Sequence, residues 1–166
     1  MWNDEDDDFG MGNMSEDEER EIDRQIKAED EYMRNHPMYK QSNEILDMVV
    51  AIIESLPENE REMHSPLLES AYMLGPKFAG ACNCGSWLLA MQNAALIRYH
   101  AEYIATGTYG FNMFGEEEVD SRYVALLQSE MKKFRVIFNV WVREINAMEQ
   151  DEDEMEDEWG LFVRGK

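Results

Sequence analysis

Large apolar residues recur at alternating spacings of three and four positions between residues 124 and 148 of this 166-residue chain. The stripe consists of Val124, Leu127, Met131, Phe134, Phe138, Trp141, Ile145 and Met148. This heptad pattern predicts a long helix, over about residues 116–149, with one face buried against other helices. Because every position of the stripe is apolar, we expect a packing surface without the inward-facing carboxylates or histidines of a bundle active site.

Two further helices are predicted earlier in the chain. Apolar residues at helical spacing run from about residue 37 to residue 56, and Pro57 ends that helix. A short linker rich in Glu and Asn follows. Ser65 is then the expected N-cap of the next helix, with Pro66 at its first helical position.

The Gly75-Pro76 pair lies inside the apolar pattern of that second core helix, so we expect a kink there rather than an end. The small residues 79–86 allow two interpretations: a tight turn, or a contact surface within one uninterrupted helix. We expect the turn, with Asn83 and Gly85 suited to positive φ and Ser86 capping the following helix.

That following helix is predicted over about residues 87–106, and a glycine- and aromatic-rich loop over 107–115 leads into the helix with the heptad stripe. Four helices with short connections predict an all-α, up-down four-helix bundle over residues 36–149. Its second helix carries the proline kink.

Acidic tails flank the predicted bundle. We expect disorder over residues 1–14, while Ser15 followed by Glu18 is a capping-box signature for a charged helix over residues 15–34. That helix has a thin apolar stripe, so its formation is expected to depend on docking. The tails are residues 1–35 and residues 150–166.

Net charge is −21, and the two tails contribute −10 and −5 of it. Phosphate backbones and anionic lipid surfaces repel such a chain, so we expect no direct nucleic-acid or membrane binding. The acidic tails favour a basic protein as partner, or serve solubility.

Cytoplasmic localisation is expected. No apolar run approaches the roughly 20 residues that span a bilayer, and the N-terminus lacks the features of a signal peptide. Cys82 and Cys84 are one residue apart, which is too close for an ordinary structural disulfide and is typical of a reducing compartment.

Residues 67–81, which read LLESAYMLGPKFAGA, and the earlier run LPENE over residues 56–60 carry a family resemblance. They resemble the proline-kinked helix, and the helix end before it, of a bacterial four-helix-bundle family first noted in intervening sequences of large-subunit ribosomal RNA. The resemblance covers about residues 38–149, although Gly75 and Gly80 stand where that family has an apolar residue and an acid. It implies the bundle fold, cyclic self-association and no established enzymatic activity.

Two kinds of metal site have partial counterparts in the sequence. Cys82 and Cys84 with His64 or His100 offer thiolate and imidazole ligands, but one Cys-x-Cys without a second pair favours small buried residues at a helix turn. No Glu-x-x-His motif of a bundle di-metal site occurs. We therefore predict no catalytic residue, metal or cofactor.

An enzyme with an unrecognised pocket remains an alternative hypothesis. Its pocket would lie among Tyr72, Gln92, Tyr99, His100 and Glu102, because Gln92 is a polar residue on an expected inner face. Buried amides are usually hydrogen-bonded structural residues, which favours the structural interpretation.

The main concentration of bases consists of Lys132, Lys133 and Arg135, with Arg143 two turns on. Lys132 and Arg135 are candidate contacts for an anionic partner, including this protein's own tails. The alternative is ordinary solvated positions beside the stripe.

The C-terminal tail holds the other candidate interaction residues. Trp159, Leu161 and Phe162 follow the acidic run 151–158, a pattern typical of docking segments. The alternative is that this apolar end folds back onto the bundle. The sequence thus indicates a non-catalytic bundle that acts through self-assembly or protein–protein interaction, or an accessory subunit of a nucleic-acid-handling complex that contacts a basic protein.

Overall fold

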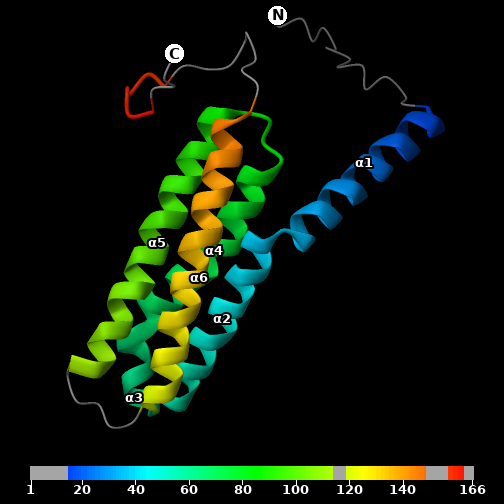
Figure 1. Cartoon of the computed structure of the whole chain (residues 1–166). Helices are drawn as coiled ribbons and strands as arrows, with labels where there is room; N and C mark the ends of the chain where they lie inside the picture. The colour runs from blue at the N-terminus through cyan, green and yellow to red at the C-terminus, as the bar shows by residue number, and fades with distance from the viewer. Residues whose placement is uncertain (1–14, 114–118, 149–156, 163–166) are drawn as a thin grey trace, which may run out of the picture. The chain divides into compact units, whose positions relative to one another are not determined.

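A computed structural model describes residues 15–113, 119–148 and 157–162 of the chain (Figure 1). All of the regular secondary structure in these ranges is helical. No residue in these ranges lies in a β-strand, which confirms the all-α prediction. The elements are α1 (Glu16–Asn35), α2 (Pro37–Ser55), α3 (Glu58–Arg61), the 3-10 helix η1 (Glu62–His64), α4 (Ser65–Cys82), α5 (Trp87–Met113) and α6 (Ser121–Asn146). Among the described helices, none combines the length and the apolarity needed to cross a membrane.

The chain divides into two compact units, residues 1–32 and residues 33–166. The first unit holds most of α1, whose residues are all at least partly exposed. The predicted capping box is present: the Glu18 carboxylate accepts from the Ser15 backbone N–H at 2.8 Å, and Ser15 Oγ accepts from the Glu18 N–H at 3.3 Å. The disorder expected for residues 1–14 lies outside the described residues.

In the second unit, α2, α4, α5 and α6 lie side by side, and each packs against two of the others (Figure 1). The contacts link α2 to α4, α4 to α5, α5 to α6, and α6 back to α2. The core fills the space between them. Its largest fully buried side chains are Phe78, Phe134, Met38, Ile45, Leu56, Leu74, Ile97, Ile104 and Leu127.

The heptad stripe on α6 faces this core, which confirms its predicted burial. Six of its residues are buried, namely Val124, Leu127, Met131, Phe134, Trp141 and Ile145, while Phe138 and Met148 are partly buried. Glu130 flanks the stripe beside Met131 and is also buried, at only 5 % exposed, so a carboxylate lies next to this packing face. Hydrogen bonds from Gln41 and Lys133 compensate its burial.

The connection between α4 and α5 is the predicted turn. α4 continues through Pro76 and ends at Cys82, so the proline does not stop the helix, as expected. Gly85 has φ +63°, a left-handed conformation that suits glycine. Ser86 Oγ accepts from the Leu89 N–H at 3.3 Å, which confirms its predicted capping role. Asn83, in contrast, has φ −124° rather than a positive value.

Before α6, three predicted boundaries are wrong. The linker after Pro57 contains α3 and η1, and α4 starts one residue early, with His64 as N-cap in place of Ser65. α5 extends through residues 107–113, which were predicted to be loop. Burial of Ile104, Thr108 and Phe111 at helical spacing stabilises that extension despite its two glycines.

The start of α6 also differs from the prediction. The helix begins at Ser121 and not near residue 116, with Asp120 as N-cap: its carboxylate accepts from the Arg122 backbone N–H at 2.9 Å. Residues 116–118, where the helix was expected to begin, lie outside the described residues. α6 ends at Asn146, three residues before the predicted end.

Candidate functional site

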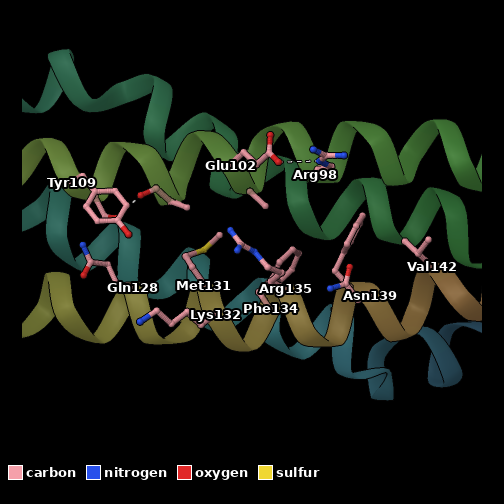
Figure 2. Close-up of a pocket in the computed structure, with 14 residues that line it drawn as sticks. Arg98, Glu102, Tyr109, Gln128, Met131, Lys132, Phe134, Arg135, Asn139 and Val142 are labelled. Atoms are coloured by element: carbon pink, nitrogen blue, oxygen red, sulfur yellow. Dashed lines mark hydrogen bonds and ion pairs between the residues drawn. The ribbon is translucent and has the colours of Figure 1, made fainter. Parts of the chain in front are cut away.

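A groove of about 520 Å³ lies between α5 and α6 and is the candidate functional site (Figure 2). Its lining is mainly apolar toward the core, where Met131 and Phe134 are buried and Phe138 is partly buried. Exposed polar and charged side chains border it: Arg98, Glu102, Tyr109, Lys132, Arg135 and Asn139. The groove thus joins an apolar floor to a charged rim.

The α6 side of the groove is a second heptad line, displaced by one residue from the buried stripe. Gln128, Lys132, Arg135, Asn139 and Val142 each follow a stripe residue and are spaced four, three, four and three apart. Since residues three and four apart share a helix face, these side chains line one wall together.

The α5 side of the groove leaves room because its side chains there are small. Ala101 and Ala105 are four residues apart and line the same groove as Phe134 and Phe138 of α6. An alanine projects only one carbon from the helix, so two consecutive turns of α5 leave the large α6 side chains incompletely covered. This geometry produces a hollow at an interface that is otherwise packed.

The groove rim is electropositive on its α6 side. Arg98 Nε donates to Glu102 Oε1 at 2.9 Å on the α5 rim, as the dashed line in Figure 2 shows. Lys132 and Arg135 are exposed and form no ion pair or hydrogen bond within the described part of the chain. The structure therefore brings these two predicted contact residues together, beside Arg98, and leaves their charges available.

An amide donor also lines the groove without a partner. Gln128 Nε2 is buried, and no described group accepts a hydrogen bond from it. A buried donor that lacks an acceptor is unfavourable by about 1–3 kcal/mol. An acceptor brought by a bound group would relieve that penalty.

The remaining predicted basic residues do not join the groove. The Lys133 ammonium donates to Glu130 Oε1 at 2.5 Å, on the side of α6 that faces α2, and Gln41 Nε2 donates to Glu130 Oε2 at 2.7 Å. These two hydrogen bonds hold the pKa of Glu130 below its ordinary value, and the bond from Lys133 has the larger effect. Arg143 is not among the groove residues. The predicted basic concentration is therefore divided between two faces of α6.

The C-terminal candidates lie on a turn built around Asp157. The Asp157 carboxylate accepts from the backbone N–H groups of Trp159 at 3.1 Å, Leu161 at 2.7 Å and Phe162 at 2.8 Å. These hydrogen bonds favour the charged carboxylate and so lower the pKa of Asp157, and the bond from the Phe162 N–H has the largest effect. Gly160 has φ +67°, which completes the turn.

This turn divides its apolar residues between two environments. Phe162 is partly buried and packs against the core, as the fold-back alternative predicted for this end of the chain. Trp159 and Leu161 remain 88 % and 80 % exposed. Trp159 and Leu161 are therefore accessible to another chain, whereas Phe162 is packed against the core of its own chain.

The cysteines and histidines considered as metal ligands do not form a common site. Cys82 and Cys84 are unbonded and partly buried, and burial raises the pKa of the Cys82 thiol. The His64 ring lies against that of Phe111 in a tilted arrangement, with centroids 4.7 Å apart, and His100 Nδ1 lies 3.3 Å from Ser70 Oγ. Within the described ranges, no three His, Cys, Asp or Glu residues come together in a metal-ligand geometry.

The five residues of the alternative enzyme pocket do not enclose the groove. Of Tyr72, Gln92, Tyr99, His100 and Glu102, only Glu102 lines it. Tyr72 and Tyr99 are 53 % and 63 % exposed. The groove residues that sequence reasoning missed are Arg98, Ala101, Ala105, Thr108, Tyr109, Gln128, Asn139 and Val142. For those on α6, the available signal was the line displaced by one residue from the α6 stripe.

Comparison with known proteins does not assign the chain to a family. No protein-family model matches the chain, and neither a curated protein nor a solved structure matches it.

Proposed function

We propose that this chain is a non-catalytic, up-down four-helix bundle that acts through self-assembly or protein–protein interaction, and that the α5–α6 groove accepts an acidic, partly apolar protein segment. The observation that carries this proposal is a single groove that joins an apolar floor to Lys132 and Arg135, two bases with no ion pair among the described residues. The cycle of contacts among α2, α4, α5 and α6 supports the bundle arrangement.

Charge favours an anionic occupant. The chain has 15 Lys and Arg residues against 36 Asp and Glu, yet three of its bases border this groove. At physiological ionic strength, charges separated by more than about 8 Å are largely screened, so the local cations outweigh the repulsion from distant acids. Each exposed ion pair contributes only about 0.2–1 kcal/mol, so charge would select the occupant more than hold it.

The apolar floor would supply most of the affinity. Burial of apolar surface stabilises a complex by about 25 cal/mol per Å², and aromatic side chains present the largest areas for it. Phe134 and Phe138 stack with ring centroids 6.5 Å apart along this floor. An occupant with one or two large apolar side chains would cover them, and an acidic group beside those side chains would meet Lys132 and Arg135.

A peptide titration tests this function. The probe is a dye-labelled acidic peptide with leucines spaced three and four apart, and the control peptide has the same composition with its leucines scattered. We expect saturable anisotropy changes for the first peptide only, at physiological salt, and at least tenfold weaker binding to the Lys132→Glu/Arg135→Glu variant. Equal binding of the two peptides, or none, would contradict the proposal.

The unpartnered Gln128 amide favours a second candidate, the binding of a small apolar carboxylate. Such a ligand would place its carboxylate toward Gln128 Nε2 and its apolar part on the floor. The discriminating measurement is isothermal titration with a medium-chain fatty acid, for the wild type and Gln128→Leu. Tight binding that the Gln128→Leu substitution weakens, together with no response to the peptide, would favour the small ligand.

A further inference from the structure

Two exposed features in the second unit of the chain match one another in chemistry. One is the α5–α6 groove, with its apolar floor and cationic rim. The other is the pair Trp159 and Leu161 on the turn at residues 157–162, which we call the C-terminal knob. Both are present in every copy of the protein.

The knob is held in a defined conformation before any contact forms. Three backbone N–H groups converge on the Asp157 carboxylate, and Gly160 N–H donates to the Asp157 carbonyl at 2.9 Å. Binding segments that are already ordered lose less conformational entropy when they dock. A turn that fixes its backbone while presenting a tryptophan and a leucine to solvent is thus prepared for docking.

The knob does not occupy the groove of its own chain. Trp159 is 88 % exposed, and no residue of the turn lines the groove. Phe162, the residue after Leu161, packs against the core of the same chain and anchors the turn there. Trp159 therefore lies three residues from this anchor, exposed and outside the groove of its own chain, where a second molecule can reach it.

The groove provides what this knob requires. An indole ring placed on the floor beside Phe134 and Phe138 would come within reach of the guanidinium groups of Arg98 and Arg135, which favour aromatic faces. Glu158, adjacent to Trp159 and exposed, would then lie near the Lys132 side of the rim. Tryptophan and arginine are the residues that most often dominate protein interfaces.

We propose that the C-terminal knob of one copy docks in the α5–α6 groove of a second copy, so that the protein self-associates through Trp159 and Leu161 on one side and Lys132 and Arg135 on the other. This inference rests on the proposed function, because it names the occupant of the same groove. Two copies that exchange knobs would form a closed dimer, and successive exchange would close a ring.

Sedimentation velocity of the full chain at tens of micromolar is the first test. We expect a defined oligomer of at least twice the 19.5 kDa monomer mass for the wild type. Trp159→Ala/Leu161→Ala and Lys132→Glu/Arg135→Glu should each give the monomer. Two controls should leave the oligomer intact: Tyr72→Ala, which removes an exposed aromatic elsewhere, and Lys40→Glu, which reverses an exposed charge on α2.

Mixing the two deficient variants makes the test specific. One variant keeps its groove and the other keeps its knob, so their mixture should form a one-to-one complex although each alone is monomeric. Circular dichroism that matches the wild type shows that both variants are folded. A monomeric wild type, controls that lose the oligomer, or variants that fail to recombine would each overturn the inference.

A crosslink locates the contact. A photoreactive benzoylphenylalanine at position 159, in a mixture of light and ¹⁵N-labelled chains, should give light–heavy crosslinks to residues 98–109 or 128–142. Crosslinks elsewhere, or within one chain only, would overturn the inference. The peptide titration separates the two failures: binding of the acidic peptide by a monomeric wild type would leave the proposed function standing without the second copy as its occupant.

Discussion

Gln41 Nε2 of α2 donates a 2.7 Å hydrogen bond to Glu130 Oε2 of α6, across 89 positions of sequence and within a buried contact. Both side chains are less than a tenth exposed. This bond fixes the register of α6 against α2, because a shift of either helix would leave a carboxylate and an amide buried without partners.

Removal of the amide should therefore destabilise the fold. We expect Gln41→Leu to lower the free energy of unfolding by about 1–3 kcal/mol, since it leaves one Glu130 oxygen buried without a donor. The double variant Gln41→Leu/Glu130→Leu should lose less than the sum of the two single variants, because it removes both polar groups at once. Urea unfolding followed by circular dichroism measures both, with Gln25→Leu on the exposed face of α1 as a control.

The same carboxylate should give the stability a dependence on pH. The pKa of Glu130 lies below its ordinary value of 4.5 because Lys133 and Gln41 hydrogen-bond to the charged form. A group whose pKa is lower in the folded chain stabilises the fold above its unfolded pKa and loses that effect as the pH falls. The wild type should thus exceed Glu130→Gln in stability above about pH 5, and the difference should shrink toward about pH 3.

Unfolding in urea across that pH range checks this expectation. Lys133→Met provides the matched comparison, because it removes the larger of the two causes and should reduce the pH-dependent difference. A stability difference that stayed constant between pH 3 and pH 7 would contradict the assignment.

His36 should act in a second pH window. Its Nδ1 accepts from the Met38 N–H at 3.1 Å and caps α2, while burial lowers its pKa against the opposing effect of Glu144. Because the pKa of His36 is lower in the folded chain than in the unfolded chain, the unfolded chain binds the proton more readily. The fold should therefore lose stability as the pH falls below the ordinary pKa of 6.5. Protonation of Nδ1 also removes the cap, which is worth about 1 kcal/mol.

Thermal unfolding between pH 7.5 and pH 5 compares the wild type with His36→Asn, which can cap a helix but does not titrate. We expect the wild type to lose stability relative to His36→Asn as the pH falls. Parallel curves would show that the cap does not depend on the neutral imidazole.

Phe78 is the aromatic centre of the core. It is fully buried, with its ring centroid 5.2 Å from that of Trp141 and 4.8 Å from that of His36. Phe78→Ala should lower the free energy of unfolding by about 3–5 kcal/mol through lost burial and a new cavity. Tyr72→Ala, six residues earlier on α4 and 53 % exposed, should change it by less than about 0.5 kcal/mol, measured by the same urea titration.

The two glycines near the end of α5 should respond differently to alanine. A Cβ at Gly110 would meet no described atom within 4 Å, so Gly110→Ala should stabilise the helix by about 0.5–1 kcal/mol. A Cβ at Gly107 would lie 3.0 Å from Leu67 Cδ1 of α4, and this contact should cancel most or all of that gain. Melting temperatures of the two single variants would show it, and equal increases would contradict the close approach at Gly107.

The region 107–113 shows why the sequence was misleading there. Its glycines and aromatics predicted a loop from local preference alone. In the structure, Thr108 and Phe111 are buried on the same face of α5 as Ile104, and this burial outweighs the roughly 1 kcal/mol per glycine that disfavours a helix. Local composition cannot reveal such compensation, because the residues that bury this face belong to other elements.

Neighbouring residues can also have different roles. Lys132 and Lys133 are adjacent in sequence, but Lys133 pairs with a buried carboxylate and Lys132 borders the groove. Successive residues point about 100° apart on a helix, so they face different neighbours. Their assignment required knowledge of which helix lies on each side of α6.

The spacing of apolar residues by itself determined that this chain forms helices and which face of α6 is buried, because helical periodicity is a local property that any core must follow. It also determined the capping box at Ser15 and the turn before α5, where backbone preference acts over a few residues. Only the tertiary structure decided that Ala101 and Ala105 line one hollow with Phe134 and Phe138, and that Lys132 and Arg135 border it. Those relationships depend on how distant helices pair and on the sizes of the side chains that meet there, which no local pattern encodes.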